Sequence, residues 1–506
     1  MFSSTADVVR RRAQSHPGRV AISFDDDRRS YADLDARTSQ VAQGLAAAGV
    51  RAGDRVAVLD RNRIEHLEVM FGAAKLGATY LPVNWRLAAD EVAYILENSG
   101  ARAVFVGTDL RGLLAGATTR PTVIDLDAEY EDWQAGQPTS DPGFEPAPTD
   151  IALQMYTSGT TGMPKGVLLS HANLCRAATL GASWGMSAET VALACMPLFH
   201  MSGTSWAFVC LFHGGRVVLL RDPDPARVLE AVAGERVSHA LLVPAVMQMV
   251  LAHPMVGSTD FSSLRRMVYG GSPISPALLA RSLDTFGCDF LQLYGLTEST
   301  GLGTVLEPED HLREPRLLRS VGKPASGVEL RIVDPATATA AAAGDVGEIW
   351  LRSGSIMSGY WQNPDATAEV LVADGWLRTG DAGYLDDNGY VFLHDRVKDM
   401  IVSGGENVYP AEVERVLREH PAVADVAVIG VPDERWGETV KAVVVPADGQ
   451  EVDPAALISY TRDRLAHYKC PTSVDVVTDL PRNASGKVLK REVREPYWQG
   501  HTRRVN

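Results

Sequence analysis

Cysteine is scarce in this 506-residue sequence, basic residues do not outnumber acidic ones, and long hydrophobic runs are missing. The five cysteines are odd in number and form no C-x-x-C pair, which excludes a disulfide framework and a zinc site of common spacing. Such thiols are typical of a reducing compartment, so we expect a cytoplasmic protein. The cysteines are Cys175, Cys195, Cys210, Cys288 and Cys470.

Charge and hydropathy exclude two further classes of protein. The formal charge of −15 argues against a nucleic-acid-binding protein, because phosphate backbones require a basic surface. The most apolar stretch, residues 241–252, is too short to cross a bilayer and contains Pro244 and Gln248. Residues 1–19 have no apolar run and predict neither a signal peptide nor an anchor. We therefore expect a soluble protein, either a monomer or a homodimer.

Helical and β-type patterns alternate along most of the chain. Apolar residues recur at helical spacing over residues 33–49 and 64–76, and the β-rich runs RVAVLD, ARAVFVG and TVIDL lie around them. The composition, 45% apolar and 22% charged, is that of a globular protein. The length suffices for about three folding units. The alternation predicts a layered α/β fold.

The pattern changes at three places. Residues 137–150 are rich in proline and acid and predict a surface connection. Residues 328–352 contain two β-runs joined by an Ala/Thr-rich loop. Beyond Asp395, amphipathic helical patterns and β-runs over about 110 residues predict a small separate domain.

Residues 156–167, YTSGTTGMPKGV, form the most specific motif. Hydroxyl side chains, glycines and Lys165 follow a predicted strand, so backbone amides, hydroxyls and one ammonium can converge on a polyanion. The motif differs from the Walker motif, because Lys165 precedes a glycine and a β-run rather than Ser or Thr and a helix. A flexible Gly/Ser turn is the alternative interpretation.

Two weaker motifs follow. In YGLTE, Thr297 and Glu298 place a hydroxyl beside a carboxylate, a pair that suits a phosphate and its divalent cation. In GWLRTGDAG, Asp381 lies in a glycine-flanked turn, where a carboxylate can accept both ribose hydroxyls. Each alone is equally typical of an ordinary turn. The sequence GASWG matches the nucleophile elbow, but it follows a helical pattern, so we interpret Ser183 as a turn residue.

These three motifs and their order resemble the adenylate-forming ANL superfamily of acyl-CoA synthetases, peptide-synthetase adenylation domains and luciferases. The resemblance covers nearly the whole chain. Further segments that carry it are PLFHMSG at 197–203, GGSP at 270–273, GEIWLR at 347–352, DRVKDMIVSGGENVYPAEVE at 395–414 and PRNASGKVLKR at 481–491.

The resemblance implies a fold and a nucleotide site. A large N-terminal body, residues 1–397, would hold two layered α/β sheets and a small β-barrel-like part, and a small mobile α+β domain, residues 398–506, would follow a hinge at Lys398. The residues implied to bind the ATP phosphates are Thr157, Ser158, Gly159, Thr160, Thr161 and Lys165. Those implied to surround the adenosine are Gly271, Ser272, Pro273, Tyr294, Gly295, Asp381 and Arg396.

The resemblance also implies roles in the first half-reaction. Thr297 would contact the α-phosphate and Glu298 would hold Mg²⁺. Lys487 would bridge the substrate carboxylate and the α-phosphate, since a preorganised cation cancels the repulsion of two anions. His200 matches an aromatic position that gates the acyl pocket in the family.

In the second half-reaction, rotation of the C-terminal domain would remove Lys487 and present Gly404 and Gly405, which leave room for the pantetheine arm of coenzyme A. Trp436 fits the nucleotide end of CoA. Cys470 and Thr472 depart from the pattern, because many relatives carry basic residues at these positions.

These residues predict an ATP- and Mg²⁺-dependent ligase that converts a carboxylic acid to an acyl-adenylate and then to an acyl-CoA thioester. The segments implied to form the acyl pocket contain no arginine or lysine, which favours a medium- or long-chain fatty acid or an aromatic acid over a dicarboxylate. Trp206 either narrows this pocket or packs in the core. The alternatives are a carrier-protein thiol acting in trans, another acceptor or oxyanion, and an inactive nucleotide-binding regulator.

Overall fold

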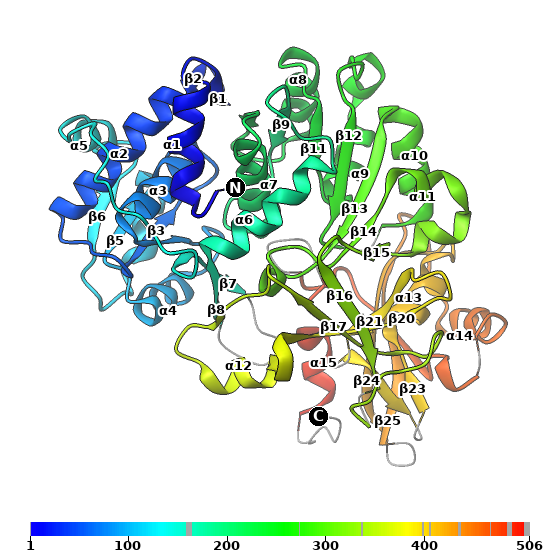
Figure 1. Ribbon diagram of the computed structural model, residues 1–506. Helices are drawn as coiled ribbons and strands as arrows, with labels where there is room; N and C mark the ends of the chain where they lie inside the picture. Colours follow the sequence, from blue (N-terminus) through cyan, green and yellow to red (C-terminus); the bar gives the residue numbers. More distant parts are fainter. Residues whose placement is uncertain are drawn as a thin grey trace. The chain divides into compact units, whose positions relative to one another are not determined.

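The computed structural model describes residues 2–157, 164–272, 274–334, 337–396, 399–403, 406–433, 437–465, 467–482 and 488–499. The chain forms two compact units (Figure 1). The first consists of Met1–Leu330 and Leu351–Leu377, and the second of Arg331–Trp350 and Arg378–Asn506.

A nine-stranded sheet in the first unit has the order β15-β14-β13-β12-β11-β9-β10-β1-β2. The strands from β13 to β1 run parallel to their neighbours, and β14, β15 and β2 add antiparallel edges. The strands are β1 (Val20–Phe24), β2 (Asp27–Ser30), β9 (Val191–Ala194), β10 (Arg216–Leu219), β11 (His239–Leu241), β12 (Arg266–Gly270), β13 (Asp289–Tyr294), β14 (Thr304–Leu306) and β15 (Lys323–Pro324).

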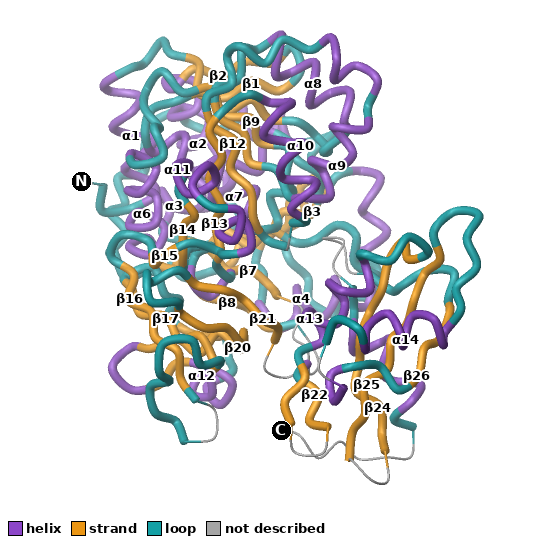
Figure 2. The backbone as a smooth tube through the Cα atoms, turned by 90° about the vertical axis from the view of Figure 1, so that its right-hand side faces the viewer, coloured by secondary structure: helices purple, strands orange, loops and turns teal. Residues whose placement is uncertain are grey.

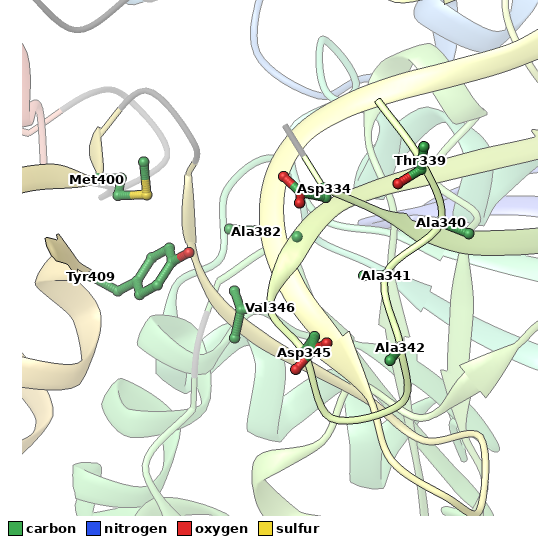
Figure 3. Close-up of a pocket in the computed structure, with 11 residues that line it drawn as sticks. Asp334, Thr339, Ala340, Ala341, Ala342, Asp345, Val346, Ala382, Met400 and Tyr409 are labelled. Carbon is green, nitrogen blue, oxygen red and sulfur yellow. The ribbon is translucent and has the colours of Figure 1, made fainter. Parts of the chain in front are cut away.

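Helices cover both faces of this sheet. In Figure 2, α8, α9 and α10 lie on one side of its strands, and α1 and α6 lie on the other. The parallel strands are therefore buried on both faces, which explains their continuous apolar runs. The helices are α1 (Thr5–Ser15), α6 (His171–Thr179), α7 (Met201–Phe212), α8 (Pro225–Gly234), α9 (Pro244–Ala252), α10 (Pro276–Phe286) and α11 (Pro308–Arg313).

A second, seven-stranded sheet has the order β18-β8-β7-β4-β3-β5-β6. Its β3, β4, β5, β6 and β7 are parallel, whereas β8 and β18 extend one edge in antiparallel pairs. The strands are β3 (Arg55–Leu59), β4 (Thr79–Pro82), β5 (Ala103–Val106), β6 (Thr122–Asp125), β7 (Ile151–Thr157), β8 (Lys165–Ser170) and β18 (Gly359–Tyr360). The accompanying helices are α2 (Tyr31–Ala47), α3 (Ile64–Leu76), α4 (Ala89–Ser99), α5 (Tyr130–Ala135) and α12 (Pro364–Val370).

Two five-stranded sheets contain the remaining strands. One has the order β16-β17-β20-β19 with β21 beside β20, and the other β23-β22-β25-β24 with β26 beside β25. The first contains β16 (Val328–Val333), β17 (Gly347–Ser353), β19 (Leu371–Val372), β20 (Trp376–Leu385) and β21 (Val391–Arg396). The second contains β22 (Ile401–Ser403), β23 (Glu406–Val408), β24 (Val423–Asp433), β25 (Gly437–Pro446) and β26 (Ser473–Val476).

Alternating apolar residues give the sheet that contains β24 two buried faces. Val426 and Val428 pack with residues of α13 (Pro410–Arg418) and α14 (Pro454–Arg462). Ala427 and Ile429 face the other way and pack with α15 (Lys490–Arg494). The period-2 pattern therefore predicts both layers of helices that the second unit shows.

The structure confirms the expected α/β architecture with a large body and a small C-terminal domain. The helix α3 coincides with the pattern at residues 64–76, and the connection at 137–150 contains no helix or strand. Val397 and Lys398 lie outside the described residues, so the boundary at 397/398 and the hinge stay predictions. No helix in the described part of the chain is long and apolar enough to span a membrane.

Candidate active site

The predicted phosphate-binding motif begins and ends where β7 and β8 meet. Thr157 pairs with Lys165, so the two strand ends lie side by side, and residues 158–163 lie outside the described residues. Gly166 follows directly, and a Cβ atom there would lie 2.6 Å from Gln154 Nε2, so a larger residue would displace this amide. The strand pair therefore places Thr157, the first hydroxyl residue of the motif, beside Lys165.

A tyrosine that the sequence did not single out links Lys165 to Glu298. The Lys165 Nζ atom lies 5.1 Å from the centroid of the Tyr360 ring. The Tyr360 hydroxyl donates a hydrogen bond of 2.8 Å to Glu298 Oε1. Tyr360 reaches this position because β18 pairs with β8. The structure thus brings together two predicted site residues, one cationic and one anionic.

Glu298 lies in the 3-10 helix η4 (Thr297–Ser299), directly after β13. The turn closes through Thr300, whose φ of 56° is in the left-handed region that non-glycine residues rarely adopt. Thr300 Oγ1 donates to the Ser355 carbonyl at 2.6 Å, and the Met357 N–H donates to the Glu298 carbonyl at 2.8 Å. The segment before β18 therefore stabilises a strained turn, a feature that is common at functional sites.

Two glycines lie at the end of β12, beside β13. A Cβ atom on Gly270 would lie 2.2 Å from the Leu293 carbonyl oxygen, so no side chain fits there. Gly271 has a φ of 76°, which favours glycine. Ser272 is half-buried and Tyr294 is buried. An exposed backbone of this kind suits the close approach of a planar ring, the role that the resemblance implies for these residues.

The predicted ribose-binding residues lie in the second unit. Asp381 and Arg396 are directly opposite each other in the pair of β20 and β21. The Asp381 N–H donates to Thr379 Oγ1 at 3.1 Å, and this hydroxyl donates to the Ile349 carbonyl at 2.7 Å. The strand register therefore brings the two predicted residues together, and a hydroxyl bridge fixes the backbone of Asp381.

His200 immediately precedes α7, and its ring packs against Phe199 with 4.6 Å between the ring centroids. Its Nε2 atom is buried and has no hydrogen-bond partner among the residues that the structure describes. Burial lowers the pKa of His200 to about 4, and the charge of Arg86 acts in the same direction. The imidazole is therefore neutral near pH 7, which suits a packed or gating ring better than a general acid.

Two arginines that stack on one indole were missed by the sequence analysis. The Arg86 Cζ atom lies 4.9 Å from the Trp85 ring and 5.9 Å from the Phe199 ring. The Arg61 Cζ atom lies 4.7 Å from the same indole, and its guanidinium pairs with Asp109 at 2.9 Å. Nothing in the local sequence signals this stacking, because it joins the ends of β3, β4 and β9.

The structure shows the surroundings of Trp206 and Ser183, whose roles the sequence analysis left open or inferred. Trp206 is 2% exposed and its indole donates to the Leu193 carbonyl at 2.9 Å, so it packs in the core. Ser183 follows the 3-10 helix η2 (Leu180–Ala182) and donates to the Leu180 carbonyl at 2.8 Å. Ser183 is therefore a turn residue and not a nucleophile.

Several predicted site residues lie outside the described residues, and their roles stay predictions. They are Ser158, Gly159, Thr160, Thr161, Pro273, Lys398, Gly404, Gly405, Trp436 and Lys487.

Glu298 offers a test of the implied Mg²⁺ ion. An ion that arrives with ATP takes one or two protein carboxylates besides phosphate oxygens and water. A half-buried carboxylate with one oxygen already held by a hydroxyl fits that need.

A glycine- and hydroxyl-rich motif between two strands, next to a carboxylate turn, defines the class of adenylate-forming enzymes. Residues 9–361 match the AMP-binding enzyme family, and residues 412–487 match the AMP-binding enzyme C-terminal domain. The chain belongs to this family, which confirms the resemblance that its motifs predicted. It is an AMP-forming acid–thiol ligase, and ATP is its nucleotide substrate.

Relatives match nearly the whole chain. The fatty acid–[acyl-carrier-protein] ligase ScoC of Streptomyces coeruleorubidus is 40% identical, over 98% of this chain and 96% of its own. The feruloyl-CoA synthase of an Amycolatopsis species is 41% identical, over 96% of this chain and 98% of its own. The crystal structure of ATP-bound MatB from Rhodopseudomonas palustris is 32% identical with a TM-score of 0.89, and covers 98% of this chain and 100% of that chain.

Proposed function

We propose that this chain joins an apolar carboxylic acid, either a medium- or long-chain fatty acid or an aromatic acid, to coenzyme A. In the first step a carboxylate oxygen attacks the α-phosphorus of ATP, and pyrophosphate leaves with the electrons of the broken P–O bond. In the second step the CoA thiolate attacks the acyl carbon, and AMP leaves as the C–S bond forms. The thiol proton passes to solvent.

The observation that carries the proposal of MgATP chemistry is the arrangement of Lys165, Tyr360 and Glu298. The Lys165 ammonium lies 5.1 Å from the centroid of the Tyr360 ring, and the Glu298 carboxylate lies 2.8 Å from the hydroxyl of the same tyrosine. Lys165 would bind the phosphates together with Thr157, and Glu298 would hold Mg²⁺. A bound Mg²⁺ ion neutralises charge that develops on the phosphates. The protein residues orient the nucleotide and keep these charges in place before it binds.

Apolar packing supports the proposed class of acid. A Cβ atom on Gly301 would lie 3.9 Å from Met201 Cβ, and one on Gly271 would lie 3.7 Å from Val243 Cγ1. Small and apolar residues therefore adjoin each other between α7, β11, β12 and η4. No arginine or lysine occurs in residues 197–213, 241–250, 267–272 or 294–304. A second carboxylate buried there would find no counter-charge on these segments themselves, which disfavours a dicarboxylate.

Coenzyme A is the proposed acceptor, and a carrier-protein thiol acting in trans is the second candidate. The relatives support both, because one is a CoA synthase and another is an acyl-carrier-protein ligase at nearly the same identity. The chain itself offers two cationic side chains, Arg61 and Arg86, that stack on Trp85, and the charge of Arg86 also acts on His200. Arginines on an aromatic surface are suited to the phosphates of a nucleotide.

We also propose that the two half-reactions use two poses of the C-terminal domain, with Lys487 acting in the first and Gly404 and Gly405 in the second. All five cysteines are free thiols, which supports a cytoplasmic location. The presence of Lys165, Thr297, Glu298, Asp381 and Lys487 together argues against an inactive nucleotide-binding regulator.

Mass spectrometry of the products tests this proposal. The enzyme would be incubated with MgATP and a mixed pool of fatty, aromatic and amino-substituted acids, in parallel with no thiol, with CoA and with a holo-carrier protein. A thioester that forms only with CoA supports the proposal and identifies the acid. Acyl-adenylate with thioester only on the carrier protein would overturn the proposed acceptor, and the absence of pyrophosphate in every reaction would overturn the proposed activity.

A further inference from the structure

The hydrogen bonding of the backbone fixes Tyr360 in position. Within β18, Tyr360 is the register partner of Val167, and the next residue, Trp361, donates its N–H to the Gly166 carbonyl at 2.7 Å. The Tyr360 N–H donates to Thr367 Oγ1 in the middle of α12 at 2.9 Å. A short strand bound on one side to β8 and on the other to a helix leaves little freedom for the direction of the ring.

The ring and the hydroxyl of Tyr360 contact opposite charges. Its face lies 5.1 Å from the Lys165 ammonium, and its hydroxyl donates to Glu298 Oε1 at 2.8 Å. In the described part of the chain, Lys165 and Glu298 form no ion pair with each other or with another side chain within 4.0 Å. Among the described residues, each charge therefore contacts the tyrosine instead of an oppositely charged side chain.

Two opposite charges so close to the same residue attract each other. If they met, the ammonium would occupy a carboxylate oxygen that a cation needs, and the carboxylate would neutralise the ammonium that phosphates need. Nucleotide binding would then have to separate the pair first. A phenol avoids this, because its ring attracts a cation while its hydroxyl donates to an anion.

We infer that Tyr360 is a positioning residue that keeps Lys165 and Glu298 apart and thereby keeps the MgATP site ready to bind. Its ring holds the ammonium and its hydroxyl orients the carboxylate. The inference rests on the proposed function in one respect, the roles of Lys165 toward phosphate and of Glu298 toward Mg²⁺. It adds a residue that holds both groups in their separate positions.

Calorimetric binding of α,β-methylene-ATP, measured with Mg²⁺ and with EDTA, tests the hydroxyl. Tyr360→Phe keeps the ring and removes only the bond to Glu298. We expect its affinity with Mg²⁺ to fall about tenfold, because a charge-assisted hydrogen bond is lost, while the affinity in EDTA changes less than about twofold. An equal change under both conditions would overturn the role of the hydroxyl.

A second variant tests the separation of charges. Tyr360→Leu keeps a smaller apolar side chain but offers neither ring face nor hydroxyl, so Lys165 and Glu298 can pair. We expect affinity in EDTA to fall about tenfold, and the double variant Tyr360→Leu/Glu298→Gln to regain most of it, because the partner charge is gone. If Glu298→Gln restores nothing, the two charges do not pair and the inference is wrong.

Tyr31→Phe is the matched control, because it removes a buried tyrosine hydroxyl that donates to the Gly215 carbonyl at 2.7 Å, far along the chain from the site. It should lower the melting temperature without changing the effect of Mg²⁺ on binding. A wild-type enzyme that binds no nucleotide would overturn the proposed function itself. A wild type that binds well, with Tyr360 variants that behave like Tyr31→Phe, would overturn only this inference.

Discussion

At the scale of single residues, burial decides the protonation state of four histidines in the first unit. Burial lowers the pKa of His66, His171, His200 and His239 to about 4 in each case. His66 and His171 have hydrogen-bond partners in Tyr80 and Thr5. His200 differs, because its buried Nε2 atom has no partner in the described part of the chain. A buried nitrogen without a hydrogen-bond partner lowers the free energy of unfolding, so the His200 ring destabilises the fold.

We expect His200→Phe to raise the free energy of unfolding by about 1 kcal/mol, because it removes an unsatisfied buried polar atom and keeps an aromatic ring. His200 makes no capping hydrogen bond to α7 that the change would remove. Because the pKa of His200 is about 4, we also expect the pH dependence of kcat/KM between pH 6 and 8 to be unchanged. Urea unfolding and initial rates at several pH values measure both effects.

His200→Ala is the control for the ring itself. It removes the same nitrogen but also the packing against Phe199, so it should lower stability by about 2 kcal/mol or more. A loss of activity above pH 6 in His200→Phe, with KM for the acid unchanged, would show that the imidazole takes part in proton transfer.

At the scale of elements, the sequence predicted most of what periodicity can encode. The helix α3 has the predicted bounds, and the β-runs around it became β3, β5 and β6. The two-residue strand β18 could not be predicted, because it is defined only by its pairing with β8. Tyr360 was missed for this reason, although Lys165 and Glu298 were predicted from their motifs.

The connection at residues 137–150 shows a second limit of the sequence. It has no helix or strand, as expected, but Asp141 pairs with Arg10 at 2.7 Å and with the buried Lys75 at 3.4 Å. Burial alone would raise the pKa of Asp141, but hydrogen bonds, first from Arg10, lower it to about 2. These contacts join residues far apart in the chain, and no local pattern reports such pairing.

The contact between β12 and β13 gives a prediction for one glycine. Gly270→Ala places a Cβ atom 2.2 Å from the Leu293 carbonyl oxygen, so the strands must separate where the predicted adenine-binding residues begin. We expect a loss of about 2–4 kcal/mol in the free energy of unfolding and weaker ATP binding. Urea unfolding and calorimetry with α,β-methylene-ATP measure these changes.

Gly112→Ala is the matched control, because a Cβ atom there has no neighbour within 4 Å. It should change neither stability nor binding appreciably. If Gly270→Ala behaved like Gly112→Ala, the close approach of the two strands would not be required for the site.

At the scale of the whole molecule, His66, His171, His200 and His239 make stability depend on pH. Their folded pKa of about 4 lies below the ordinary value of 6.5, so the folded state favours the neutral ring. Their contribution is therefore complete above pH 6.5 and is lost as the pH falls from 6.5 toward 4. Each ring changes the free energy of unfolding by about 1.4 kcal/mol per pH unit in this window.

We expect the urea midpoint to fall steeply between pH 6.5 and 4.5 and to be nearly constant from pH 7 to 8. His200→Phe removes one of these rings, so its slope in the acidic window should be smaller than that of the wild type. His213 and His311, whose pKa burial also lowers, contribute equally to both proteins. Asp125 and Asp141, whose pKa is lowered to about 2, act only below about pH 4 and do not contribute to this window. A slope that is the same in both proteins would show that His200 takes up its proton at an ordinary pH.

A substitution of Lys487 distinguishes the two half-reactions that one molecule performs. Lys487→Ala should slow acyl-adenylate formation by about 10²–10³-fold, because it removes a preorganised cation between two anions. Thioester formation from supplied acyl-adenylate should be nearly unchanged, since we propose that Lys487 leaves the site before the thiol reacts. Pyrophosphate release and thioester yield, measured separately, report the two steps. A comparable fall in both would mean that Lys487 serves the two steps in one arrangement, and the proposed rotation about Lys398 would then be unnecessary. If adenylation alone falls, the repulsion between the two anions is a barrier only in the first step, and the C-terminal domain is free to bring different residues to the second.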